Sequence, residues 1–211
     1  MVDTMGMDPA RIERLRSPDR LEYFHPDRIW EVLKPASHCT LVDIGAGVGF
    51  LTLPFAERFP QAKAYGCDIL EGMVSLLRKD AVERDLKNVE VLLMGPNAIA
   101  LPDDSADFIV MGQLHHELDA PEPLMVECNR LLKPAGVVAI IDWADADNGK
   151  SPPVGRRVPV AVMQGQLEDA GFSNIETHDV YDYHTFMTGT ASLLPNSKGS
   201  IHEYGSSYRC A

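Results

Sequence analysis

The residues whose spacing most clearly suggests chemistry are three glycines that follow an apolar run. Residues 41–50 read LVDIGAGVGF, so Gly45, Gly47 and Gly49 lie between a strand-like segment and a helical pattern. Glycines at such a junction permit a tight turn and a close approach of a ligand to the backbone, while the helix that follows offers unpaired N–H groups. Asp43 precedes the first glycine, where a carboxylate would repel a diphosphate and attract an ammonium group. The turn therefore predicts a site for a ligand with a cationic group.

The sequence around the glycines argues against a dinucleotide or a nucleoside triphosphate as the ligand. A dinucleotide fingerprint requires a glycine at position 50, which is Phe50, and no P-loop lysine follows the turn. The next apolar run ends at Asp68, whose carboxylate can accept both hydroxyls of a ribose. These features predict a nucleoside with a positively charged tail. The competing interpretations are glycines that serve helix packing alone, and Asp43 and Asp68 as caps of turns or helices.

A second polar group follows the fourth and fifth apolar runs. Gln113, His115, His116 and Glu117 come after the fourth run, and Asp142 ends the fifth. Histidine titrates near neutrality, so His116 could act as a general base, while Glu117 or Asp142 orients it or takes that role. The alternative is that the two histidines hold the loop in place and do no proton transfer.

Strand-like and helical segments alternate from residue 39 onward. Strands are expected over 39–44, 62–68, 89–94, 107–111, 136–142, 174–181 and 183–188, and helices over 48–59, 70–84, 121–132 and up to about 170. Such alternation indicates βαβ units and a parallel sheet that is covered on both faces. Ligands of such sheets bind beyond the carboxyl ends of the strands, where both polar groups lie.

With these motifs in this order over residues 39–142, the sequence resembles the class I S-adenosylmethionine-dependent methyltransferases, including the ubiquinone/menaquinone-biosynthesis type. The matching segments are VDIGAGVG at 42–49, GCDI at 66–69, LPDDSAD at 101–107, QLHH at 113–116 and LLKPAG at 131–136. The resemblance implies the α/β class and a Rossmann-like, mostly parallel seven-stranded sheet of order 3-2-1-4-5-7-6. The last strand would be antiparallel, with helices on both faces. Three parts are expected: a helical extension or lid (1–36), the cofactor-binding domain (37–190) and a polar tail (191–211).

The resemblance also implies a cofactor, S-adenosylmethionine, and its product, S-adenosylhomocysteine. Its expected contacts are Asp43 at the amino group, Asp68 at the ribose and apolar side chains near the adenine. The full expected set is Asp43, Gly45, Ala46, Gly47, Gly49, Asp68, Ile69, Met73, Asn97, Ala98 and Gln113. The family usually has an acid after the third strand, where this chain has Gly95-Pro96-Asn97-Ala98. This departure motivates a second hypothesis, a regulatory or scaffold protein that binds the cofactor without turnover.

Composition limits the partners. The 211 residues carry a formal net charge of −12, which argues against a nucleic-acid partner. The four cysteines are far apart, so neither a structural metal site nor a disulfide framework is indicated. No apolar run is long enough to span a bilayer, and a cytoplasmic protein is expected. The leading hypothesis is methyl transfer to a small-molecule acceptor, with the acceptor and the oligomeric state left open.

Overall fold

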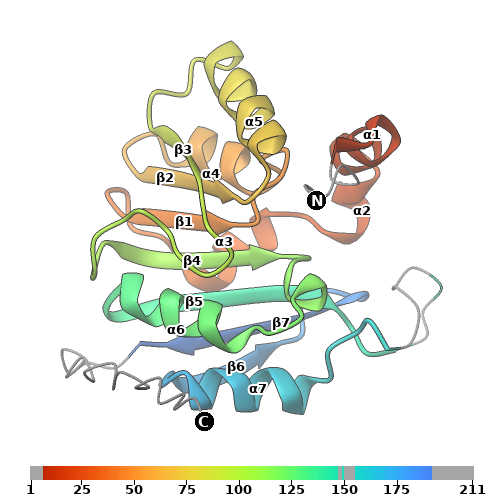
Figure 1. Cartoon of the computed structure of the whole chain (residues 1–211), viewed down its shortest axis with the longest axis vertical. Helices are drawn as coiled ribbons and strands as arrows, with labels where there is room; N and C mark the ends of the chain where they lie inside the picture. Colours follow the sequence, from red (N-terminus) through yellow and green to blue (C-terminus); the bar gives the residue numbers. More distant parts are fainter. Residues whose placement is uncertain (1–6, 147–148, 150–154, 192–211) are drawn as a thin grey trace, which may run out of the picture.

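The computed structural model describes residues 7–146, 149 and 155–191. Its strands are β1 (Thr40–Ile44), β2 (Lys63–Asp68), β3 (Val89–Leu93), β4 (Ala106–Gly112), β5 (Leu132–Trp143), β6 (Ser173–His178) and β7 (His184–Thr190). They form one seven-stranded sheet in the order β3-β2-β1-β4-β5-β7-β6 (Figure 1). Strand β7 pairs antiparallel with both β5 and β6, whereas the pairs among β1 to β5 are parallel. The predicted fold class, strand order and antiparallel last strand are confirmed.

The central strands bury both faces, and successive residues contribute to different clusters. On β4, Ile109 and Met111 belong to one cluster and Val110 to the other. The first cluster is covered by α6 (Glu122–Leu131) and α7 (Val160–Asp169). The second is covered by α3 (Asp27–Leu33) and α4 (Thr52–Arg58), and α5 (Glu71–Glu83) packs beside α4. Successive side chains of a strand point to opposite faces of the sheet, so a strand between two helical layers buries apolar residues on both faces.

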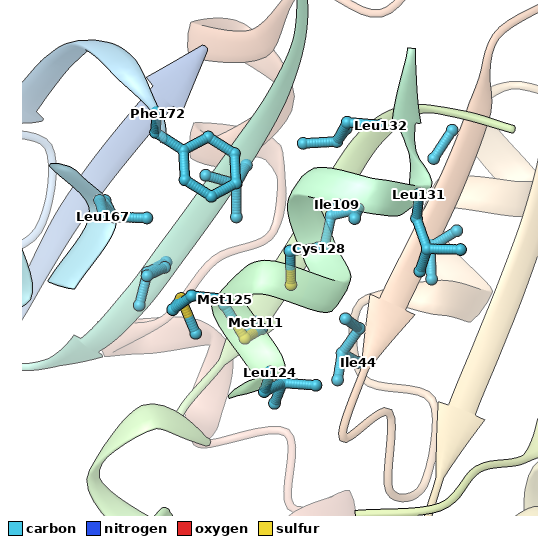
Figure 2. Close-up of a cluster of buried hydrophobic side chains, with 14 of the residues drawn as sticks. Ile44, Ile109, Met111, Leu124, Met125, Cys128, Leu131, Leu132, Leu167 and Phe172 are labelled. Carbon is cyan, nitrogen blue, oxygen red and sulfur yellow. The ribbon is translucent and has the colours of Figure 1, made fainter. Parts of the chain in front are cut away.

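Helix α6 shows how the helical pattern gives the packing. Leu124, Met125, Cys128 and Leu131 recur at helical spacing and form one apolar stripe. Figure 2 shows these side chains between the helix and the sheet, with Phe172 beside the same cluster. This stripe packs α6 against the sheet, and α6 directly follows the loop that carries His115 and His116.

Short helices precede the sheet. Helices α1 (Pro9–Arg16) and α2 (Arg20–Tyr23) lie beside the ends at which the parallel strands finish (Figure 1). Asp8 caps α1 by accepting a hydrogen bond from the Ala10 N–H, and Pro9 occupies a position where no backbone donor is needed. None of the residues of α1 is buried, and two of its arginines form ion pairs with the rest of the molecule, Arg11 with Glu117 and Arg16 with Asp80.

Some boundaries differ from the expected ones. Strand β5 starts at Leu132, four residues before the expected start at 136, because Leu132 pairs with Ala106 ahead of an irregularity in the ladder. Pro134 and the positive φ of Ala135 (64°) mark that irregularity. The expected tail lies outside the described residues apart from Ala191. Within the described residues, no helix is long and apolar enough to cross a membrane.

Candidate functional site

The glycine-rich turn joins β1 to α4, and its three glycines differ in their surroundings. All have positive φ, 70° at Gly45, 52° at Gly47 and 81° at Gly49, a conformation that side chains disfavour. A Cβ on Gly49 would overlap Leu77 of α5, whereas the nearest atom to a Cβ on Gly47 is 4.0 Å away. Gly49 is therefore a packing glycine, and Gly47 leaves open space above the turn.

Asp68 ends β2 and holds the turn from the side. Its Oδ2 accepts a hydrogen bond from the Gly47 N–H (2.8 Å), and its Oδ1 accepts one from the Leu70 N–H (2.9 Å). Burial raises the pKa of this carboxyl, and the N–H groups of Leu70, Gly47 and Ile69 oppose the increase. Since each carboxylate oxygen has a second lone pair, Asp68 can still accept hydrogen bonds from a ligand.

Asp43 lies below the turn and is nearly inaccessible. Thr52 at the start of α4 donates a hydrogen bond from its Oγ1 to Asp43 Oδ2 (2.5 Å). Burial raises the pKa of Asp43 to about 7 despite the Thr52 hydrogen bonds, with a smaller contribution from the charge of Asp68. A cationic group beside Asp43 would favour its ionised form.

A cavity of about 950 Å³ opens at the carboxyl ends of the strands. Most of the expected site residues line it, namely Asp43, Gly45, Ala46, Gly47, Asp68, Ile69, Met73, Asn97, Gln113, His116 and Glu117. Gly49, Ala98 and Asp142 are absent from its lining. Gly49 packs against α5, and Asp142 is 1% exposed and lies behind His116.

His116 and Asp142 form a hydrogen-bonded pair between two strand ends. His116 belongs to the 3-10 turn η2 (His115–Glu117), and its Nδ1 lies 2.7 Å from Asp142 Oδ1. Asp142 also accepts from the His116 backbone N–H (2.9 Å) and from the Trp143 N–H (2.7 Å). A carboxylate at Nδ1 places the proton there and leaves Nε2 with a lone pair. Nε2 is thus the ring nitrogen that can meet a ligand in the cavity.

The other expected acid–base residues have different surroundings. Arg11 of α1 pairs with Glu117 at 3.1 Å, and both side chains are partly exposed. His115 is buried and does not line the cavity, and burial lowers its pKa. Of the two histidines, only His116 lines the cavity, and Glu117 links the 3-10 turn to α1.

A hydrogen-bonded group at the cavity joins the expected residue Gln113 to two residues that the sequence did not indicate, Arg20 and His184. Arg20 of α2 donates from Nη2 to Gln113 Oε1 (2.7 Å), and Gln113 Nε2 lies 2.8 Å from His184 Nε2. Aromatic rings surround His184, among them Phe24 and Trp143 with ring centroids 4.8 and 4.5 Å away. Burial lowers the pKa of His184 to about 4, so the neutral ring accepts from the Gln113 amide. No local motif marks Arg20 or His184, because their partners are far away in the sequence.

The comparisons with known proteins agree on a family. Residues 42–140 match the model of a methyltransferase domain. A demethylmenaquinone methyltransferase of Symbiobacterium thermophilum is 30% identical and is aligned over 94% of this chain and 91% of its own length. Aklanonic acid methyltransferase DauC of Streptomyces sp. (strain C5) is 36% identical over 99 residues, so the chain spans 44% of the length of that relative.

Solved structures show the same fold. The structure of a SAM-dependent methyltransferase from Aquifex aeolicus has a TM-score of 0.79 and 34% identity, over 87% of this chain and 98% of that one. The [4+2]-cyclase SpnF has a TM-score of 0.69 at 18% identity, over 80% of each chain, which is a likeness of fold alone. With its strand order, its glycine-rich turn and a relative aligned over nearly its whole length, this chain belongs to the class I S-adenosylmethionine-dependent methyltransferases.

Proposed function

We propose that the protein transfers a methyl group from S-adenosylmethionine to a small-molecule acceptor. The observation that carries the proposal is a single cavity that reaches from the glycine-rich turn to the His116–Asp142 pair. Its volume of about 950 Å³ is at the upper end of the range for small-molecule sites, as a site for two ligands requires.

The residues of the turn fit this cofactor. The open space at Gly47 admits a ligand next to the backbone, and the Asp68 carboxylate can accept the ribose hydroxyls. Asp43 offers a buried carboxyl to the cationic amino group. At the rim, the 58% exposed side chain of Ile69 provides an apolar surface for the adenine, and Asn97 provides an amide.

When bound, S-adenosylmethionine supplies a methyl group on a positively charged sulfur, which leaves with the electron pair of the broken carbon–sulfur bond. His116 Nε2 takes the proton that the acceptor atom loses as its new bond to the methyl carbon forms. Asp142 holds the imidazole in the required tautomer and stabilises the imidazolium. Positioning of the two ligands in one cavity supplies much of the remaining rate.

Beyond the residues that fit the cofactor, the cavity has apolar and cationic walls. Phe24, Phe50, Leu118 and Trp143 line it, together with Arg156 from the segment after β5. Aromatic walls favour a flat apolar acceptor. Demethylmenaquinone and aklanonic acid, the compounds named for two relatives, are therefore the first acceptors to test.

Two measurements test the proposal. Calorimetric titration with S-adenosylhomocysteine should show binding to the wild type and weaker binding to Asp68→Ala. Labelled S-adenosylmethionine should then transfer its methyl group to a member of an acceptor panel that includes both compounds and simple hydroxylated aromatic acids. A folded protein that binds no cofactor at millimolar concentration refutes the proposal. Binding with no transfer to any acceptor favours the regulatory or scaffold alternative.

A further inference from the structure

Arg20 is a buried cation in the wall of the cavity. Only 6% of its surface is exposed, and its guanidinium lies over the ring of Phe50, 3.9 Å from the centroid. Nη1 donates to the Leu15 carbonyl (2.8 Å) and Nη2 to Gln113 Oε1 (2.7 Å). Because Gln113 is itself held by His184, the guanidinium is fixed from several sides before any ligand arrives.

The charge of Arg20 is not neutralised by the protein. Its hydrogen-bond partners are the Leu15 carbonyl, the Gln113 amide oxygen and the Tyr23 side chain, and no carboxylate of the described residues lies within ion-pair distance. Burial lowers the pKa of Arg20 to about 10, and Tyr23 opposes this effect, so the side chain remains a cation at neutral pH. An unpaired buried charge is costly, and a bound anion would remove that cost.

The donor geometry suits a carboxylate. A guanidinium carries five N–H groups in a planar fork that matches the two oxygens of a carboxylate. The same cavity also contains the buried carboxyl of Asp43, which bonds to Thr52. A buried cation and a buried acid that do not neutralise each other are complementary to a zwitterionic α-amino acid, with its ammonium at Asp43 and its carboxylate at Arg20.

We propose that Arg20 is the carboxylate-binding residue of the cavity, and that it binds the amino-acid end of the cofactor. This inference rests on the proposed function, because it takes S-adenosylmethionine as the ligand. An acidic group on the acceptor has the same chemistry, and the cavity also carries the cations of Arg11, Arg14 and Arg156. The two sources can be separated by the ligand used.

The test compares two ligands that differ only in the carboxylate. S-adenosylhomocysteine has it, whereas S-adenosyl-3-thiopropylamine keeps the ammonium and lacks the carboxylate. Calorimetry on the wild type should show a preference for S-adenosylhomocysteine of about 10-fold or more, as expected for a charge-assisted pair. Arg20→Gln should abolish the preference by weakening only S-adenosylhomocysteine, and Arg20→Lys should keep part of it.

Arg14→Gln is the charge-matched control, since Arg14 also lines the cavity but is exposed. An equal loss of preference in Arg14→Gln would mean a general effect of charge and would overturn the assignment to Arg20. If Arg20→Gln does not fold, the side-chain Nε–H resonance of Arg20, assigned with Arg20→Lys, is followed in the wild type. It should shift with S-adenosylhomocysteine and remain in place with the decarboxylated analogue.

A second arm tests the acceptor as the source. The wild type and Arg20→Gln, both saturated with S-adenosylhomocysteine, are titrated with 1-hydroxy-2-naphthoate. If only the affinity for 1-hydroxy-2-naphthoate depends on Arg20, Arg20 is still a carboxylate-binding residue, but its ligand is the acceptor and not the cofactor. No dependence in either arm overturns the proposal. A wild type that binds neither cofactor analogue refutes the proposed function itself, which is a separate result.

Discussion

His116 Nδ1 lies 2.7 Å from Asp142 Oδ1, although the two residues are 26 positions apart in the sequence. Their elements bring them together, because His116 follows the end of β4 at Gly112 and Asp142 lies next to the end of β5 at Trp143. The carboxylate is buried and is also held by two backbone N–H groups, so the imidazole has one orientation. This arrangement separates the residue that meets the ligand from the residue that orients it.

Loss of the base should slow turnover without loss of cofactor. We expect His116→Ala to lower kcat by about 10²–10⁴-fold with an acceptor that must lose a proton. Asp142→Asn should also lower kcat, because the imidazole loses the carboxylate that fixes its tautomer. S-adenosylhomocysteine affinity, measured by calorimetry, should change little in both. Equal turnover in wild type and His116→Ala would show that no base at this position is required.

Loss of the ribose-binding carboxylate should affect the cofactor first. Asp68→Ala should weaken S-adenosylhomocysteine binding by roughly 1–3 kcal/mol, because the ligand hydroxyls and the Gly47 N–H lose a charged acceptor. Asp68→Asn keeps an oxygen acceptor and should lose less. Calorimetric affinities of the two variants, compared with wild type, test this order, and unchanged affinity in Asp68→Ala would contradict the assignment.

Substitution of two glycines in the same turn should affect different properties, mainly stability at Gly49 and mainly cofactor affinity at Gly47. Gly49→Ala should lower the free energy of unfolding by about 2–5 kcal/mol, because a Cβ there overlaps Leu77 at a positive φ. Gly47→Ala should cost about 1–2 kcal/mol from backbone strain alone, yet lose cofactor affinity because the methyl group fills the open space. Urea denaturation and calorimetry on both variants separate the two roles. Similar losses of stability and affinity in both would contradict them.

The buried carboxyl of Asp43 should make stability depend on pH. Between its ordinary pKa of 3.8 and about 7, the folded state holds a proton that the unfolded state has lost, so this group makes stability fall as pH rises. Asp43→Asn is neutral throughout and can still accept from Thr52. Its stability relative to wild type should therefore increase with pH across this window, at up to about 1.4 kcal/mol per pH unit, and be constant above it. Urea denaturation from pH 4.5 to 8.5 checks this, and a difference that is independent of pH would contradict it.

Loss of the Arg11–Glu117 ion pair should affect the local stability of helix α1 more than the rate of methyl transfer. Glu117→Gln and Arg11→Gln should both increase hydrogen exchange in residues 9–16 and weaken cofactor binding by about 0–1 kcal/mol, less at high salt. Arg16→Gln breaks the α1 ion pair with Asp80 and serves as a control that spares Glu117. A turnover loss above about 100-fold in Glu117→Gln alone would instead make Glu117 the base.

The sequence predicted the sheet well because its signals are local. Buried strands appear as apolar runs, and the βαβ pattern leaves few topologies. The glycine-rich turn and Asp68 were also visible, since each follows directly from a strand end. By contrast, the pairing of Arg11 with Glu117 spans 106 residues, and that of Arg20 with Gln113 spans 93. No local pattern reveals such contacts.

Other details of the site depend on distant packing for the same reason. Asp142 was expected either to orient His116 or to act as the base, and its carboxylate contacts His116 and two backbone donors. Gly49 looked equivalent to Gly47 in the motif, and the positions of Leu77 in α5 and Leu53 in α4 distinguish them. Residue type and spacing therefore indicated the region of the site, while the packing of distant elements determines which of these residues line the cavity.

The contacts of Gln113 also set an order of events during synthesis. Its amide is held between Arg20 and His184, so this part of the wall is complete only after His184 has left the ribosome. At 5–20 residues per second, roughly 8–33 seconds separate the synthesis of Arg20 from that of His184. Leu15, Phe50 and Gln113, which contact the guanidinium, are all synthesised before the end of that interval. A nascent chain that stops before β7 therefore contains the partners of Arg20 but lacks His184, which holds the Gln113 amide.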